Sequence, residues 1–155
     1  MKKLAFFLMG LLMLAACSEQ TPFAYRGLPF TLSTTQLLDS MRARGFDIDS
    51  AASSQTTMVL ANPAVRYRVL VAYSGDKLLA IQENYLLSTN DSTRRMWQQV
   101  RDGLEKELGE WPNCPILKDD HKVANFDATD GIISVTLENT YRPTMMVKYT
   151  PKSQR

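Results

Sequence analysis

The sequence has very few of the residue types from which catalytic and metal centres are built. Its 155 residues include one histidine, His121, and two cysteines, Cys17 and Cys114. It contains no CxxC, HExxH or GxSxG motif and no glycine-rich phosphate loop. Asp119 and Asp120 precede His121, but neighbouring side chains on an extended segment diverge, so a metal site is not expected there. We therefore predict no metal, no cofactor and no enzymatic activity; a convergent cluster of polar groups around His121 would reopen the enzymatic alternative.

The chain also lacks an excess of charge of either sign. It has 18 basic and 16 acidic residues, and two of the basic residues, Lys2 and Lys3, lie at the extreme N-terminus. Without these two the charges balance, which removes any long-range attraction to nucleic acid or to anionic lipid. We therefore expect no nucleic-acid partner.

No apolar run is long enough to span a membrane as a helix. The longest uncharged, mostly apolar run extends from Leu4 to Ala16, which is short of the roughly 20 residues that a membrane span needs. It follows two lysines and ends in small residues before Cys17, which is the pattern of a secretory signal. Residues 1–16 are therefore predicted to be a signal peptide.

The end of this segment, Leu14-Ala15-Ala16-Cys17, resembles the lipobox of bacterial lipoproteins. The resemblance implies cleavage between Ala16 and Cys17, acylation of Cys17, and attachment to a membrane through the acyl chains. The next residue is Ser18 and not aspartate, which in this class implies the outer membrane. We expect residues 17–27 to be the lipidated N-terminus and a tether, and residues 28–155 to form a single domain, facing the periplasm.

Periodicity and turn signals predict two helices and six strands in that domain. The first helix begins at Ser33 with a capping box to Gln36 and ends at Gly45; the second begins at Asn90-Asp91-Ser92 and ends near Leu108. The strands are expected at 56–61, 65–73, 78–87, 122–126, 132–138 and 144–150. The segment from Trp111 to Pro115, which holds Cys114, is expected to be irregular. Cys114 would have no intramolecular disulfide partner, because Cys17 carries lipid.

The resulting order, α-βββ-α-βββ, predicts an α+β fold in which antiparallel sheet packs against two helices. A doubled unit would give this order. The sequence leaves open whether the two sets of three strands form one sheet or two. The order is similar to that of BamE-like lipoproteins of the outer-membrane assembly machinery and of secreted beta-lactamase inhibitor proteins. The similarity is one of element order only, and both groups act by binding proteins.

Four residues are candidates for an interaction surface. Met146 should point away from the inward-facing Met145, and Tyr141 precedes the same strand. Arg94 and Arg95 lie in the first turn of the second helix, where the helix dipole disfavours cations, so an acidic partner would explain them.

Two functions follow as hypotheses. The first is a protein-binding, assembly or accessory module for an envelope protein, which predicts an exposed apolar patch near Met146 or an unpaired edge strand. The alternative is a carrier of a small apolar or lipidic ligand, which predicts that the stripe of the second helix from Trp97 to Leu108 lines a void.

Overall fold

The computed structural model describes residues 23–152. The predicted signal peptide 1–16, the cleavage between Ala16 and Cys17 and the lipidation of Cys17 lie outside the described residues. The described elements are β1 (Ala24–Tyr25), β2 (Leu28–Pro29), α1 (Thr34–Ala43), β3 (Asp47–Ile48), β4 (Thr57–Ala61), β5 (Tyr67–Ser74), β6 (Lys77–Tyr85), α2 (Asn90–Leu108), β7 (Asn113–Leu117), β8 (His121–Ala128), β9 (Gly131–Glu138) and β10 (Thr144–Pro151). The predicted α+β class is confirmed.

The strands β3 to β10 form one antiparallel sheet with the order β3-β4-β5-β6-β10-β9-β8-β7. Each half is a four-stranded meander preceded by a helix, and the last strands of the two halves, β6 and β10, pair at the centre. The architecture is therefore a doubled α-ββββ unit. Three strands per half were expected, and the missing ones are the short outer strands β3 and β7. The segment around Cys114 is strand β7, not an irregular segment, because an edge position tolerates prolines.

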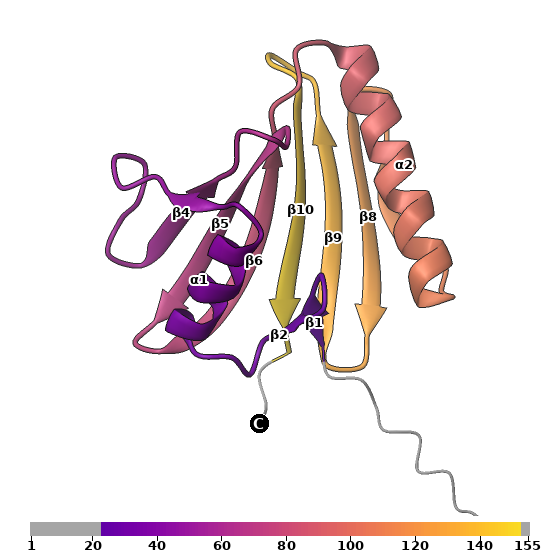
Figure 1. Cartoon of the computed structure of the whole chain (residues 1–155). Helices are drawn as coiled ribbons and strands as arrows, with labels where there is room; N and C mark the ends of the chain where they lie inside the picture. Colours follow the sequence, from indigo (N-terminus) through magenta and orange to yellow (C-terminus); the bar gives the residue numbers. More distant parts are fainter. Residues whose placement is uncertain (1–22, 153–155) are drawn as a thin grey trace, which may run out of the picture.

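Both helices and the β1–β2 hairpin lie on the same side of the sheet (Figure 1). One buried cluster joins α1 through Leu37 and Met41, α2 through Trp97 and Leu104, and the inward face of the strands. The indole Nε1 of Trp97 donates to the carbonyl of Val135 at 3.1 Å, which fixes α2 on β9. The predicted inward residues of the last strand, Met145, Val147 and Tyr149, are all buried.

The helix ends follow local capping rules. Ser33 and Gln36 form the predicted capping box of α1, and Gly45 has a φ of +84° just beyond its end. The helix α2 is capped by Thr89, one residue before the predicted start, because Thr89 is extended and exchanges hydrogen bonds with Ser92.

The predicted tether, residues 17–27, is wrong from residue 23 onward. Phe23 stacks on Phe30 with ring centroids 5.2 Å apart, and Tyr25 is buried in the core. The turn of the β1–β2 hairpin is Arg26-Gly27, and both residues have positive φ, as a two-residue hairpin turn requires. The folded domain therefore starts at least five residues earlier than expected.

Strand β6 also departs from the predicted alternation. A register shift opposite Ala72 and Tyr73 turns Leu78 into the core and leaves Leu79 exposed. Strict alternation along the predicted strand 78–87 would place Leu79 on the same face as Ile81, but the bulge moves it to the outside.

Candidate functional site

A buried carboxylate occupies the centre of the covered face of the sheet. Glu83 of β6 is 1% exposed and lies in a register row that is otherwise apolar, formed by Val69, Val147, Val135 and Ala124. A charge in such a place needs a partner and hydrogen-bond donors, because burial without them is costly.

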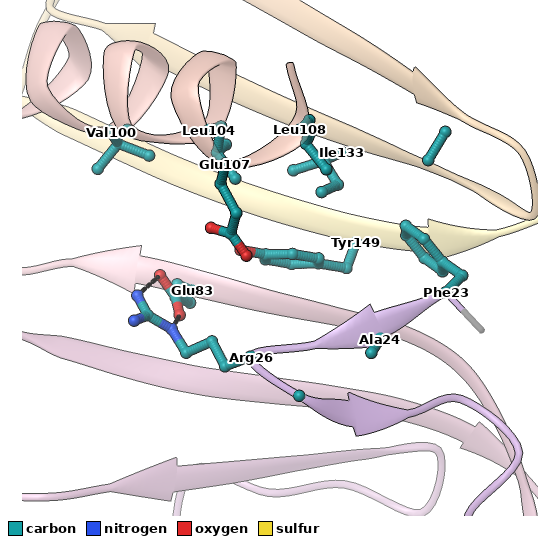
Figure 2. A pocket seen from close by; sticks show the side chains of 13 residues that line it. Phe23, Ala24, Arg26, Glu83, Val100, Leu104, Glu107, Leu108, Ile133 and Tyr149 are labelled. Carbon is teal, nitrogen blue, oxygen red and sulfur yellow. Dashed lines mark hydrogen bonds and ion pairs between the residues drawn. The ribbon is translucent and has the colours of Figure 1, made fainter. Parts of the chain in front are cut away.

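Four donors satisfy this carboxylate. Oε1 of Glu83 accepts from the Tyr25 hydroxyl at 2.8 Å and from Nε of Arg26 at 2.5 Å. Oε2 accepts from Nη2 of Arg26 at 3.0 Å and from the Tyr85 hydroxyl at 2.8 Å. The bidentate Arg26 pair, drawn in Figure 2, fastens the N-terminal hairpin to the sheet.

The cluster holds its protons firmly. Burial, and then the negative charge of Glu83, raises the pKa of Tyr25 and of Tyr85 well above the ordinary tyrosine value. The hydrogen bond to Glu83 raises the pKa of the Arg26 guanidinium. At neutral pH both hydroxyls therefore stay protonated and Arg26 stays charged, and the cluster holds the hairpin on the sheet.

A cavity of about 450 Å³ lies beside the cluster, between the C-terminal half of α2, the N-terminal hairpin and the sheet (Figure 2). Its apolar wall is formed by Phe23, Ala24, Val100, Leu104, Leu108, Ala128 and Ile133. Its polar groups come from Arg26, Glu83, Glu107 and Tyr149. The volume falls within the range of small-molecule sites.

The stripe of α2 divides between core and cavity. Trp97 is packed in the core, whereas Val100, Leu104 and Leu108 line the cavity. Gly103 lies on the same wall, and a Cβ built on it meets no atom within 4 Å. Gly103 is exposed and therefore does not serve close packing of the helix on the sheet.

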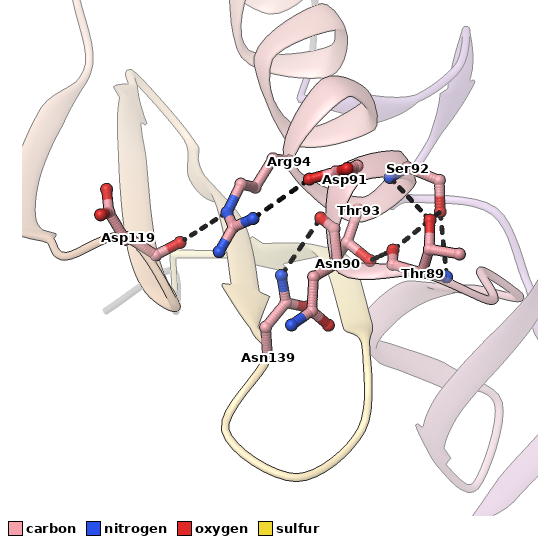
Figure 3. A network of polar contacts seen from close by, with 8 residues as sticks. All are labelled: Thr89, Asn90, Asp91, Ser92, Thr93, Arg94, Asp119 and Asn139. Carbon is pink, nitrogen blue, oxygen red and sulfur yellow. Dashed lines mark hydrogen bonds and ion pairs between the residues drawn. The ribbon is translucent and has the colours of Figure 1, made fainter.

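The four predicted interaction residues differ in their surroundings. Met146 is half-buried on the other face of the sheet, and its direct partners on the neighbouring strands are the polar Asn84 and Thr136. Arg94 is bound within the protein: Nε donates to the Asp119 carbonyl at 3.1 Å and Nη1 to Asp91 at 3.3 Å (Figure 3). Arg95 is exposed.

Tyr141 is 97% exposed, in the loop between β9 and β10. The base of this loop is fixed by the buried Asn139, whose backbone N–H donates to Asp120 at 2.7 Å and whose Nδ2 donates to the Asn90 carbonyl at 3.3 Å (Figure 3). The loop and the start of α2 lie at the same end of the sheet, opposite the end at which β1 begins (Figure 1). Tyr141 and Arg95 are thus brought to one end of the domain.

His121 is half-buried at the start of β8. Within residues 23–152 no group of three histidine, cysteine or acidic side chains could hold a metal ion. Cys114 is half-buried on β7, and its thiol lies 3.9 Å from the Pro112 carbonyl. No helix among these residues is long and apolar enough to cross a membrane.

Sequence reasoning missed the Glu83 cluster and Arg26. The available signal is a single acid, Glu83, at the centre of an otherwise apolar strand face. Its partner could not be found from sequence, because Arg26 lies in the segment that was assigned to the tether.

Comparison with protein-family models, with curated proteins and with solved structures finds no match to this chain. The lipoprotein resemblance and the similarity in element order therefore remain predictions.

Proposed function

We propose that this chain is a lipid-anchored, protein-binding accessory module of the bacterial outer membrane, facing the periplasm, with Cys17 acylated and an envelope protein as its partner. The observation that carries the proposal is Tyr141: a fully exposed aromatic on a loop whose base is fixed by hydrogen bonds. Tyrosine is enriched among residues that dominate binding energy, and a fixed loop loses little entropy on association.

The placement of this loop supports the proposal. The described chain begins with β1 at one end of the sheet, and the β9–β10 loop lies at the other end (Figure 1). If Cys17 holds the N-terminus at the membrane, Tyr141 and Arg95 project away from it, where a protein partner has access.

A photo-reactive amino acid placed at Tyr141 of the acylated full chain tests the proposal in the native envelope. We expect one discrete crosslinked protein from position 141. Position 111 is the control: Trp111 is also exposed, at 85%, but it lies beyond the other end of α2, so no crosslink is expected there. An acidic partner surface further predicts that Arg95→Glu weakens the crosslink from position 141. Equal crosslinking from both positions, or none from 141, would exclude this surface.

A second candidate function is the carrier of a small apolar or lipidic ligand. The observation that favours it is the cavity beside α2, whose wall is built from Val100, Leu104 and Leu108 of the helix stripe. Solvent extraction of the purified, acylated protein followed by mass spectrometry tests it: a stoichiometric amphiphile supports the carrier function, and an empty extract argues against it.

A further inference from the structure

The cavity beside α2 has an unbalanced charge. Glu83 is already bound by Arg26 and by two tyrosine hydroxyls, so this pair contributes no net charge. Glu107 also lines the cavity, and among residues 23–152 it forms no ion pair. Glu107 is exposed to solvent, so the remaining charge is negative but screened by water, and it disfavours an anionic head placed directly beside it.

The rest of the wall suits a flexible hydrocarbon. Val100, Leu104 and Leu108 present one apolar strip along α2, and Phe23 and Ile133 add to the apolar wall. The buried Tyr149 also lines the cavity. These groups fit one alkyl chain that ends in an uncharged or cationic head.

The position of the cavity brings lipid close to it. Phe23, the first described residue, is part of its wall. Six peptide steps separate Phe23 from Cys17, so an acyl group on Cys17 starts within about 20 Å of the cavity. A short connection of this kind gives a high effective concentration for a group attached to Cys17.

We infer that this cavity binds a single long acyl or alkyl chain whose head is uncharged or cationic. The inference deepens the second candidate function and rests on it. Two sources supply this chemistry: an acyl chain on Cys17 of the same molecule, in which the head is a neutral ester or amide, and a free amphiphile from the membrane.

Three photo-reactive probes with one long chain and different heads test the inference. The chain carries a diazirine and a terminal alkyne, and the heads are an alcohol, an amine and a carboxylate. The probes are added to envelopes that contain the full chain, irradiated, and mapped by mass spectrometry. We expect adducts in the tryptic peptides 102–106 and 107–118, with the alcohol and the amine labelling up to about fivefold more than the carboxylate. Glu107→Lys should reverse this preference.

Gly103→Leu is the blocking variant. Gly103 is exposed and lines the cavity, and a leucine there would meet no neighbour at Cβ, so the protein should fold; its side chain would narrow the cavity mouth, and labelling should fall. Gln99→Leu, on the exposed side of α2, is the matched control and should label like the native chain.

The source is decided by comparing the acylated chain with Cys17→Ala. Labelling that rises in Cys17→Ala identifies the chain's own acyl group as the occupant, and equal labelling identifies a free amphiphile. Absence of adducts on these peptides in both proteins, or adducts that Gly103→Leu leaves unchanged, would overturn the inference. Two other measurements test the remaining proposals separately. The mass of the N-terminal peptide reports whether Cys17 is acylated, and crosslinking at Tyr141 reports whether a protein partner binds there.

Discussion

Arg26 and Glu83, 57 residues apart in the chain, form a bidentate ion pair that joins the turn of the N-terminal hairpin to the centre of the sheet. The two sides of the pair differ in exposure, since the Arg26 side chain is 45% exposed and that of Glu83 is 1% exposed. Arg26 also holds a φ of +47°, which is unfavourable for a residue with a Cβ. The ion pair explains why arginine stands at this turn position.

Removing Arg26 should destabilise the fold because it leaves the Glu83 carboxylate buried with only neutral donors. We expect Arg26→Met to lower the free energy of unfolding by about 2–4 kcal/mol in urea denaturation. The double variant Arg26→Met/Glu83→Gln should lose less than Arg26→Met alone, since no buried charge remains. Asp102→Asn, which breaks a solvent-exposed pair with Arg101, is the control and should cost less than about 0.5 kcal/mol. A double variant as unstable as the single one would contradict the assigned role.

The buried tyrosines should make the protein sensitive to alkali. The unfolded chain releases tyrosine protons near pH 10, whereas burial raises the pKa of Tyr25, Tyr85 and Tyr149 in the folded protein. The folded state thus retains protons that the unfolded state loses. The free energy of unfolding is therefore unaffected by these groups below pH 10 and falls above it, by up to about 1.4 kcal/mol per pH unit for each tyrosine.

Urea denaturation at several pH values between 8 and 11 measures this slope, and absorbance at 295 nm follows the ionisation. Tyr85→Phe should lower the slope by the contribution of one tyrosine, at a cost of about 1 kcal/mol at neutral pH for the lost hydrogen bond. Stability that does not change between pH 9 and 11 would mean that these hydroxyls are accessible to water in the folded protein.

Local signals predicted most of the fold. The start of α1 is predicted by a four-residue motif, the capping box between Ser33 and Gln36. The buried face of β10, formed by Met145, Val147 and Tyr149, is predicted by alternation alone. The doubled architecture followed from element order, although the strands β3 and β7 were too short, or too rich in proline, to be recognised.

The candidate site could not be predicted because its residues come from distant segments. The role of Arg26 depends on its contact with Glu83, which is distant in the sequence. The cavity likewise forms only where the hairpin lies beside Leu104 and Leu108 of α2. Periodicity gives the face of each element but not which faces remain unfilled when the elements assemble. The same limit applies to Arg94, whose hydrogen bond to Asp119 spans two elements.

Gly131, at the start of β9, lies directly under the ring of Phe23. A Cβ at this position would overlap three atoms of that ring, so Gly131→Ala must displace Phe23 from its stack on Phe30. We expect a loss of about 1–3 kcal/mol in the free energy of unfolding, which is typical of overpacking. In a Phe23→Ala background the same substitution should cost much less. Equal costs in both backgrounds would show that Phe23 does not cover Gly131 in solution.

Gly103 should behave in the opposite way, because its Cβ would point into open space on the wall of the cavity. Gly103→Ala is expected to raise the free energy of unfolding by about 0.5–1 kcal/mol, since alanine has the higher helix propensity and meets no neighbour within 4 Å. Gly45→Ala is the matched control: Gly45 has a φ of +84° and a Cβ there would lie 3.1 Å from Asn62 Nδ2, so this substitution should destabilise. Thermal unfolding of the two variants beside the native chain measures both signs. If Gly103→Ala were destabilising, this part of α2 would have a neighbour closer to position 103 than the structure shows.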